Sequence, residues 1–239
     1  MLNEDTIQNK IINVTLELAE KESWANISMA EIASAADIGL AGVRAHFLTK
    51  REILQAFAKA VDVTVLKIME DEAGSEELND IARDSLFDVI MTRLEVMAPY
   101  RLALSNILSD IKRGKGLDNI SLKQLWGSNK WMLSAAGIST SGKKGILKTA
   151  GLSTIYMQVL PVWFEDEDPG LAKTMATLDK SLRKGEKTLQ QIEKVTATGE
   201  KILCDLKGLF RKNKPKKEPE QPVKEKSSDE SAGPEATQV

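Results

Sequence analysis

The sequence predicts an all-α protein, and three observations carry that prediction. Apolar residues recur at helical steps of three and four, as at Ile7, Ile11, Val14 and Leu18. Strand patterns joined by turn pairs do not occur in the sequence. Aromatic residues make up 5% of the 239 residues, and seven prolines leave long uninterrupted stretches, a profile typical of helix bundles.

The first two helices are predicted from an apolar stripe and a capping signal. The stripe named above places a helix at residues 6 to 22. Ser28 and Glu31 have the spacing of a capping box, in which each side chain satisfies a free backbone N–H at a helix start. A second, short helix is therefore expected at residues 29 to 36.

A third short helix and a long fourth one follow. After a tight turn, residues 40 to 47 can form a helix that Gly42 weakens by roughly 1 kcal/mol relative to alanine. Thr49 and Glu52 have the spacing of a second capping box, which opens a helix ending near residue 74. Three short helices followed by a long one, with a tight turn between the second and third, are typical of a helix-turn-helix unit.

The rest of the chain is read as helical wherever a period is visible. Asp168 and Pro169 together predict a helix start, because Asp caps helices and Pro tolerates the first helical position. Another helix is expected to begin at residue 75, and an apolar helical stripe is expected to stop at Pro99. Further helices are expected at 102–111, 122–135 and 146–163. The expected domains are a helix-turn-helix domain at 1–48, a connecting helix at 49–74, a bundle at 75–198, an amphipathic helix at 199–211 and a disordered tail at 212–239.

Composition excludes several classes of protein. The net charge of −2 gives no basic footprint for nucleic acid by itself. The lone Cys204 excludes an internal disulfide framework and favours a reducing cytoplasm, and the lone His46 excludes a His-pair site. The N-terminus lacks the pattern of a signal peptide, and the longest uncharged stretch, residues 149 to 164, is shorter than the roughly 20 residues of a membrane span.

The N-terminal 50 or so residues resemble the DNA-binding domain of TetR-family regulators. The matching parts are the first-helix stripe, Ser-Met-x-x-Ile-Ala at 28–33, Ala-Ala-x-Ile at 35–38, His-Phe at 46–47 and Lys-Arg-Glu-Ile-Leu at 50–54. The resemblance implies that the third helix enters the DNA major groove, that Ser28 and Lys50 contact phosphates, and that a C-terminal bundle dimerises and holds a ligand. The DNA-binding residues expected from it are Ser28, Gly39, Leu40, Ala41, Gly42, Arg44, His46 and Lys50.

Two features of this domain depart from that pattern. Residues 39 to 42 are Gly, Leu, Ala and Gly, so no side chain before Arg44 can make a bidentate contact to a base. Residues 1 to 60 carry six basic and eight acidic side chains, a net charge of −2, whereas phosphate neutralisation supplies most non-specific DNA affinity. The alternative is a three-helix scaffold that does not read DNA.

A second resemblance supports this alternative. Residues 125 to 189 are similar to the C-terminal region of the ubiquinone-biosynthesis accessory family, which has a TetR-like fold and binds lipid. Trp163, Asp166 and the helix after Asp168 align with that family's tryptophan, acidic turn and final core helix. In such a fold an isoprenoid or other apolar ligand would lie in a pocket lined by Met97, Trp126, Trp131, Tyr156, Met157 and Trp163. The other interpretation is that these side chains simply fill a core.

Residues 201 to 217 suggest a membrane contact. Ile202, Leu203, Leu206, Leu209 and Phe210 give one apolar helix face, and seven Lys and Arg residues flank or follow it. This pattern is typical of a helix on an anionic membrane surface, where each basic group contributes about 1 kcal/mol. The other interpretation is a last helix docked on the bundle with a solvated basic tail.

No enzyme motif is complete. Residues 137 to 144 nearly spell a phosphate-binding loop, but Lys144 replaces its Ser or Thr and no strand precedes it. The acids at 165–168 are read as a solvated helix start rather than a metal cluster, and His46 has no evident acid or nucleophile partner. No metal or cofactor is expected.

The sequence therefore predicts a TetR-like, all-α homodimer of the cytoplasm. A ligand-responsive regulator that binds double-stranded DNA and a small apolar ligand is the first functional hypothesis. The alternative hypothesis is a lipid-binding accessory protein of ubiquinone biosynthesis that acts at the membrane surface without binding DNA.

Overall fold

The computed structural model describes residue 2 and residues 6–73, 82–113 and 122–212; for 73, 122–126 and 193–212 it describes the backbone alone. All regular elements in these ranges are helices, as the sequence predicts. The chain divides into two compact units after Ile192, and everything that follows concerns the first of them unless stated otherwise.

The N-terminal unit is built from three short helices, and side chains cap the N-termini of the first two. Helix α1 (Ile7–Lys21) begins at Thr6, whose hydroxyl accepts from the Asn9 N–H at 3.1 Å. Helix α2 (Met29–Ala35) has both halves of the predicted capping box, and α3 (Leu40–His46) follows after a turn. The three helices pack on a mainly apolar core that includes Ile11, Ile12, Leu16, Trp24, Ile32 and Val43.

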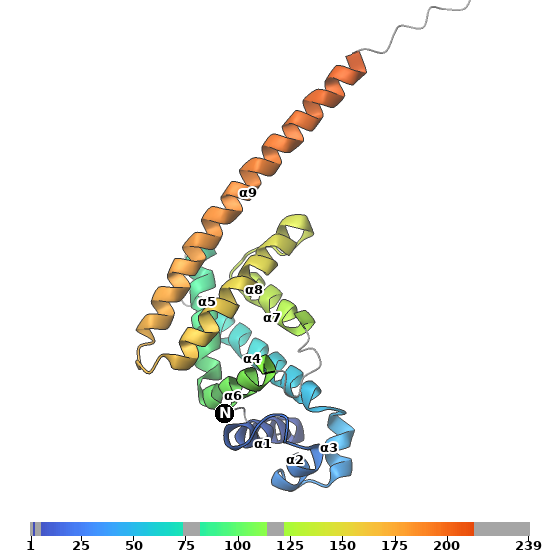
Figure 1. Cartoon of the computed structure of the whole chain (residues 1–239), viewed down its shortest axis with the longest axis vertical. Helices are drawn as coiled ribbons and strands as arrows, with labels where there is room; N and C mark the ends of the chain where they lie inside the picture. Colours follow the sequence, from blue (N-terminus) through green and yellow to red (C-terminus); the bar gives the residue numbers. More distant parts are fainter. Residues whose placement is uncertain (1, 3–5, 74–81, 114–121, 213–239) are drawn as a thin grey trace, which may run out of the picture. The chain divides into compact units, whose positions relative to one another are not determined.

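Helices α4 to α8 form a bundle that continues from α3 (Figure 1). Helix α4 leads from α3 into the bundle and contacts α1, α5 and α7, while α7 packs against α8. The bounds are α4 Lys50–Ala73, α5 Ala82–Met97, the 3-10 turn η1 Ala98–Tyr100, α6 Arg101–Lys112, α7 Leu122–Ala135, α8 Gly142–Glu165 and α9 Ala172–Lys212. Among the described residues, no helix is both long and apolar enough to cross a bilayer.

Helix α6 is tied to the end of α1 by side chains. Asn106 Nδ2 donates to the carbonyls of Ala19 at 3.1 Å and Glu20 at 3.2 Å, and so satisfies acceptors that the end of a helix leaves free. Asp110 accepts from Ser23 Oγ at 2.6 Å and from Trp24 N–H at 2.7 Å. Since Asp110 is buried, these bonds fix α6 against the N-terminal unit.

The start of α9 is not where the sequence predicts it. Asp168 accepts from the Gly170 N–H at 3.0 Å in a local turn, and Leu171 has φ of +52°, outside helical geometry. The capping residue is Asp166 instead, whose carboxylate accepts from Thr174 N–H at 2.8 Å and Thr174 Oγ1 at 2.7 Å. Asp166 caps the helix from the other side of this turn. The helix begins at Ala172, so the predicted start at Asp168 and Pro169 is wrong.

Helix α9 also continues through the predicted boundary at residues 198 and 199. Its backbone is helical from Ala172 to Lys212, whereas the sequence suggests a separate amphipathic helix at 199–211. The expected helix start at 75 lies outside the described residues, and so do the side chains of 201–212. The same holds for the expected disordered tail at 212–239 except for the backbone of Lys212, which ends α9.

Candidate functional site

The first turn of α3, on the surface of the helix-turn-helix unit, is small and apolar. Ser28, Gly39, Ala41, Arg44 and His46 are exposed, and Gly42 is partly exposed. Leu40 at the start of α3 exposes 55% of its surface, and Leu48 just after α3 exposes 56%. The α3 face is therefore accessible, but its first turn offers a leucine and an alanine where a base reader would need hydrogen-bond donors or acceptors.

The N-termini of α2 and α4 already hold carboxylates of this chain. Glu31 Oε2 accepts from Ser28 N–H at 2.6 Å, while Ser28 Oγ accepts from Glu31 N–H at 3.1 Å. The backbone hydrogen bond from Ser28 is the largest cause that lowers the pKa of Glu31 from its ordinary value of 4.5. At α4, Glu52 Oε2 accepts from Leu48 N–H at 2.7 Å. An incoming phosphate would meet negative charge at both helix ends.

Lys50 is partly buried, and its ammonium is bonded to the protein. Its ammonium donates to the Trp24 carbonyl at 2.5 Å and lies 4.9 Å from the centre of the Trp24 ring. Burial lowers the pKa of Lys50, with Glu31 acting in the opposite direction. The side chain that the TetR resemblance assigns to a phosphate thus already has a carbonyl acceptor and an aromatic face.

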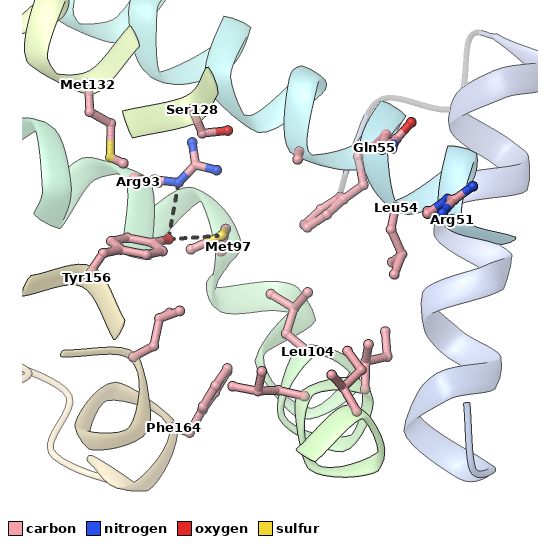
Figure 2. Close-up of a pocket in the computed structure, with 16 residues that line it drawn as sticks. Arg51, Leu54, Gln55, Arg93, Met97, Leu104, Ser128, Met132, Tyr156 and Phe164 are labelled. Carbon is pink, nitrogen blue, oxygen red and sulfur yellow. Dashed lines mark hydrogen bonds between the residues drawn. The ribbon is translucent and has the colours of Figure 1, made fainter. Parts of the chain in front are cut away.

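An apolar cavity of about 220 Å³ lies between helices α4, α5, α6, α7 and α8. Figure 2 shows its lining side chains converging from these helices. Most are aliphatic or aromatic, and the polar ones gather at two places. The full lining is Arg51, Leu54, Gln55, Phe57, Ala58, Arg93, Met97, Leu104, Ile107, Leu108, Ile111, Ser128, Met132, Tyr156, Leu160 and Phe164.

One end of the cavity carries a buried polar cluster, which we call the Arg93 cluster: Arg93, Asp62, Tyr156 and Ser128. Arg93 forms an ion pair with Asp62 through Nη1, and its Nε donates to the Tyr156 hydroxyl oxygen at 3.1 Å. Ser128 Oγ donates to the other Asp62 oxygen at 2.8 Å. Each of the four residues is at least 92% buried, so these bonds replace the water that the polar groups lost on folding.

Tyr156 contributes a protonated phenol to this cluster. Burial raises its pKa above the ordinary value of 10.0, although Arg93 acts in the opposite direction. The phenol donates to Met97 Sδ at 3.9 Å, and Figure 2 shows this bond beside the bond from Arg93. A thioether sulfur is a weak acceptor.

The structure brings together only part of the predicted pocket. Met97 and Tyr156 line the cavity. Trp131 and Met157 do not: their residues expose 57% and 45% of their surface, because they lie on the outer faces of α7 and α8. Trp163 is fully buried but is absent from the cavity wall. The side chain of Trp126 lies outside the described residues.

Trp163 packs in the core at the end of α8, where it contacts Arg101. The Arg101 guanidinium lies 5.2 Å from its ring centre and donates to the carbonyls of Trp163 and Asp166. Arg101 therefore satisfies acceptors at the end of α8 from the neighbouring helix α6. Trp163 therefore fills the core and does not line this cavity, and helical spacing cannot distinguish a core tryptophan from a cavity wall.

The two charged residues of the Arg93 cluster, Arg93 and Asp62, were not predicted, although the sequence held a signal for them. Arg93 falls at a core position of the apolar stripe formed by Leu86, Ile90, Leu94 and Met97. Asp62 similarly follows Val61 in an apolar part of α4. A charge at a core position calls for a buried partner. The sequence does not show which of 35 acidic residues that partner is.

Comparison with known proteins gives two kinds of relative. The chain is 23% identical over 212 residues to ubiquinone biosynthesis protein COQ9, mitochondrial, of Homo sapiens, covering 86% of this chain and 66% of the human protein. The Rattus norvegicus protein of that name is 22% identical over 211 residues, covering 86% and 67%. The chain thus spans about two thirds of these relatives' length. No family model matches it.

The similar solved structures are TetR transcriptional regulators. One from Nitrosomonas europaea ATCC 19718 has a TM-score of 0.58 at 23% identity, covering 76% of this chain and 99% of its own. One from Rhodococcus sp. RHA1 has a TM-score of 0.51 at 13% identity, covering 77% and 97%. The chain therefore has the TetR fold, and both resemblances drawn from the sequence are confirmed.

Proposed function

We propose that this chain is a TetR-fold, non-enzymatic accessory protein that binds an isoprenoid lipid of the kind used in ubiquinone biosynthesis. The observation that carries the proposal is the apolar cavity of about 220 Å³ enclosed by α4 to α8. Largely apolar pockets with a few placed polar groups are typical binding sites for such molecules. The similarity to COQ9 over 86% of the chain supports the lipid class.

The helix-turn-helix unit supports the same choice over the regulator hypothesis. Glu31 and Glu52 occupy the helix ends that would receive phosphates, and Lys50 is engaged with Trp24. Non-specific DNA affinity comes mainly from cations that neutralise phosphates. These contacts therefore favour a domain that has the helix-turn-helix fold but binds DNA weakly.

A DNA-binding regulator is the second candidate, and one observation favours it. Helix α3 stays exposed, with Arg44 and His46 accessible near its C-terminal end. In that case we expect a homodimer in which ligand binding in the cavity changes the affinity for DNA.

We also propose contact with a membrane surface through residues 201–217. The support is the sequence pattern of one apolar face followed by lysines and arginines, together with the helical backbone up to Lys212. Removing residues 201–239 should then abolish flotation of the protein with liposomes containing anionic lipid, while neutral liposomes bind neither form. Unchanged flotation of the truncated protein would contradict the membrane contact.

The test of the main proposal compares lipid and DNA binding in one preparation. Native mass spectrometry and lipid extraction of the purified full chain should show an isoprenoid bound at close to one molecule per chain. Duplexes from upstream of its own coding region should show no more binding than random duplexes at low salt. An empty cavity together with steeply salt-dependent binding to one duplex would overturn the proposal and establish the regulator.

A further inference from the structure

The cavity has two unlike polar ends, and they differ in how they meet solvent. The Arg93 cluster closes one end, and Arg93 and Tyr156 are 95% and 96% buried. Arg51 and Gln55, near the start of α4, line the other end, where Arg51 is exposed and Gln55 partly exposed (Figure 2). Between them the wall is apolar, with Leu54, Leu104 and Phe164 among its side chains. A ligand with one polar head and one apolar tail therefore meets a different environment in each of the two orientations it can take in the cavity.

The closed end has hydrogen-bond donors that a ligand could use. A guanidinium carries five N–H donors. In this structure Arg93 directs Nε to Tyr156 and Nη1 to Asp62, and the residue also forms part of the cavity wall. The Tyr156 hydroxyl donates only weakly, since its acceptor is the Met97 sulfur at 3.9 Å. A ligand oxygen placed here would be a better acceptor than the thioether.

The charge of the closed end selects among polar heads. Asp62 lies opposite Arg93 in an ion pair, so the guanidinium is already compensated. A second anion placed beside the pair would be buried without a counter-charge and would face the Asp62 carboxylate, which is strongly unfavourable in a low-dielectric site. A neutral oxygen acceptor meets no such penalty. The cluster therefore favours a hydroxyl or carbonyl head over a carboxylate or phosphate.

The size of the cavity bears on where the tail goes. About 220 Å³ is less than the roughly 300 to 1,000 Å³ of pockets that enclose a whole drug-sized ligand. A long isoprenoid chain does not fit inside, so part of it must leave by the accessible end near Arg51 and Gln55. With the head at the closed end, the length of the tail is not limited by the cavity.

We infer that the Arg93 cluster is the head-group site of the cavity and takes the neutral, oxygen-bearing head of an isoprenoid, with the tail directed toward Arg51 and Gln55. The inference rests on the proposed lipid-binding function and deepens it. Tyr156 and Arg93 are its specificity-determining residues, and an isoprenoid alcohol, phenol or quinone is the ligand class.

A displacement experiment tests the head group. The full chain, stripped of lipid, is loaded with a neutral fluorescent naphthylamine and titrated with geranylgeraniol, the hydrocarbon of the same chain, and geranylgeranyl diphosphate. The alcohol should displace the fluorophore at a roughly tenfold lower concentration than either of the others, the effect of one hydrogen bond to a charged group. Tyr156→Phe should reduce this preference to less than about threefold. Leu104→Ala, in the apolar wall, should weaken all three ligands alike.

The outcomes separate the inference from the function it rests on. If the three ligands bind equally, or if Tyr156→Phe keeps the full preference for the alcohol, the head-group site is wrong while lipid binding stands. Tighter binding of the diphosphate than of the alcohol likewise overturns the neutral head. If none of the three displaces the fluorophore, the proposed function itself fails.

Photolabelling of the unmodified protein tests the direction of the ligand, and it does not depend on a variant that folds. A diazirine beside the hydroxyl of geranylgeraniol should label peptides containing Met97, Met132 or Tyr156. A diazirine on the last isoprene unit should label peptides containing Leu54 or Gln55 instead. The reverse labelling pattern would overturn the proposed orientation.

Discussion

The contacts that Lys50 makes with Trp24 indicate a role in stability, although its residue type and position resemble those of a phosphate-binding lysine. Its ammonium bonds the Trp24 carbonyl at 2.5 Å over the Trp24 ring. We predict that Lys50→Met lowers the free energy of unfolding by about 1 kcal/mol, since the carbonyl loses its donor. Urea denaturation measures this, and Lys59→Met, an exposed residue of the same helix, should change it by less than about 0.5 kcal/mol.

The same variant distinguishes the two functions of the helix-turn-helix unit. If Lys50 contacted a phosphate, Lys50→Met would reduce the salt slope of DNA binding by about one. We expect no change in the slope of whatever weak binding exists. A reduced slope with unaltered stability would return Lys50 to the role that the family resemblance implies.

Glu31 makes the stability of the N-terminal unit depend on pH. Its pKa is lowered below 4.5 by the Ser28 backbone hydrogen bond, so its contribution is complete above about pH 4.5 and is lost as the pH falls through the lower folded-state pKa. We predict that wild type is more stable than Glu31→Gln at about pH 7 and that the difference shrinks toward about pH 3. Urea midpoints of both proteins at the two pH values measure it.

The control for this prediction is Glu95→Gln, which alters an exposed carboxyl of α5. The difference between this variant and wild type should be small at both pH values. A Glu31→Gln difference that stays constant with pH would mean that the capping bond does not depend on the charge of the carboxylate.

At the scale of the element, two of the three glycines of α8 should respond in opposite ways to substitution by alanine. A Cβ at Gly145 would overlap the backbone carbonyl of Thr140, whereas nothing lies within 4 Å of the position at Gly151. We predict that Gly145→Ala lowers the free energy of unfolding by about 1 to 3 kcal/mol, because the preceding loop has to move. Gly151→Ala should raise it by about 0.5 to 1 kcal/mol through its higher helix propensity.

Thermal denaturation of the two variants beside wild type is the measurement. Both variants replace a glycine of α8 by alanine. Changes of opposite sign in the free energy of unfolding would therefore come from the close contact between Gly145 and the loop at Thr140. Destabilisation by both substitutions would show that α8 is not helical around Gly151 in solution.

At the scale of the whole molecule, ligand binding in the cavity should stabilise the fold. A ligand at about 100 times its Kd adds about 2.7 kcal/mol, or roughly 5 to 10 °C in Tm for a chain of this size. We predict that geranylgeraniol gives such a shift in wild type and that Leu104→Trp, which fills the cavity, removes it. Leu102→Trp on the same helix should keep the shift, since Leu102 is 57% exposed. A full shift in Leu104→Trp would place the ligand elsewhere.

The sequence by itself determined the elements and the fold class. Helical period, the capping box at Ser28 and the stop at Pro99 are local signals, each read within a few residues, and α1 to α4 begin and end within about two residues of prediction. The helix-turn-helix unit followed from these elements, because three short helices with these turns have few ways to bury Ile11, Ile32 and Val43 together. The TetR fold was implied by the family resemblance of the N-terminal 50 or so residues.

Only the tertiary structure decided the site. Arg93 and Asp62 are 31 positions apart, and Arg93 and Tyr156 are 63 apart, so their meeting depends on how α4, α5 and α8 cross. The same packing turned Trp131 and Met157 outward and enclosed Trp163 against Arg101. A stripe at helical spacing states that a face is apolar, but which neighbour covers it, and where a void remains, depends on contacts between residues distant in the chain.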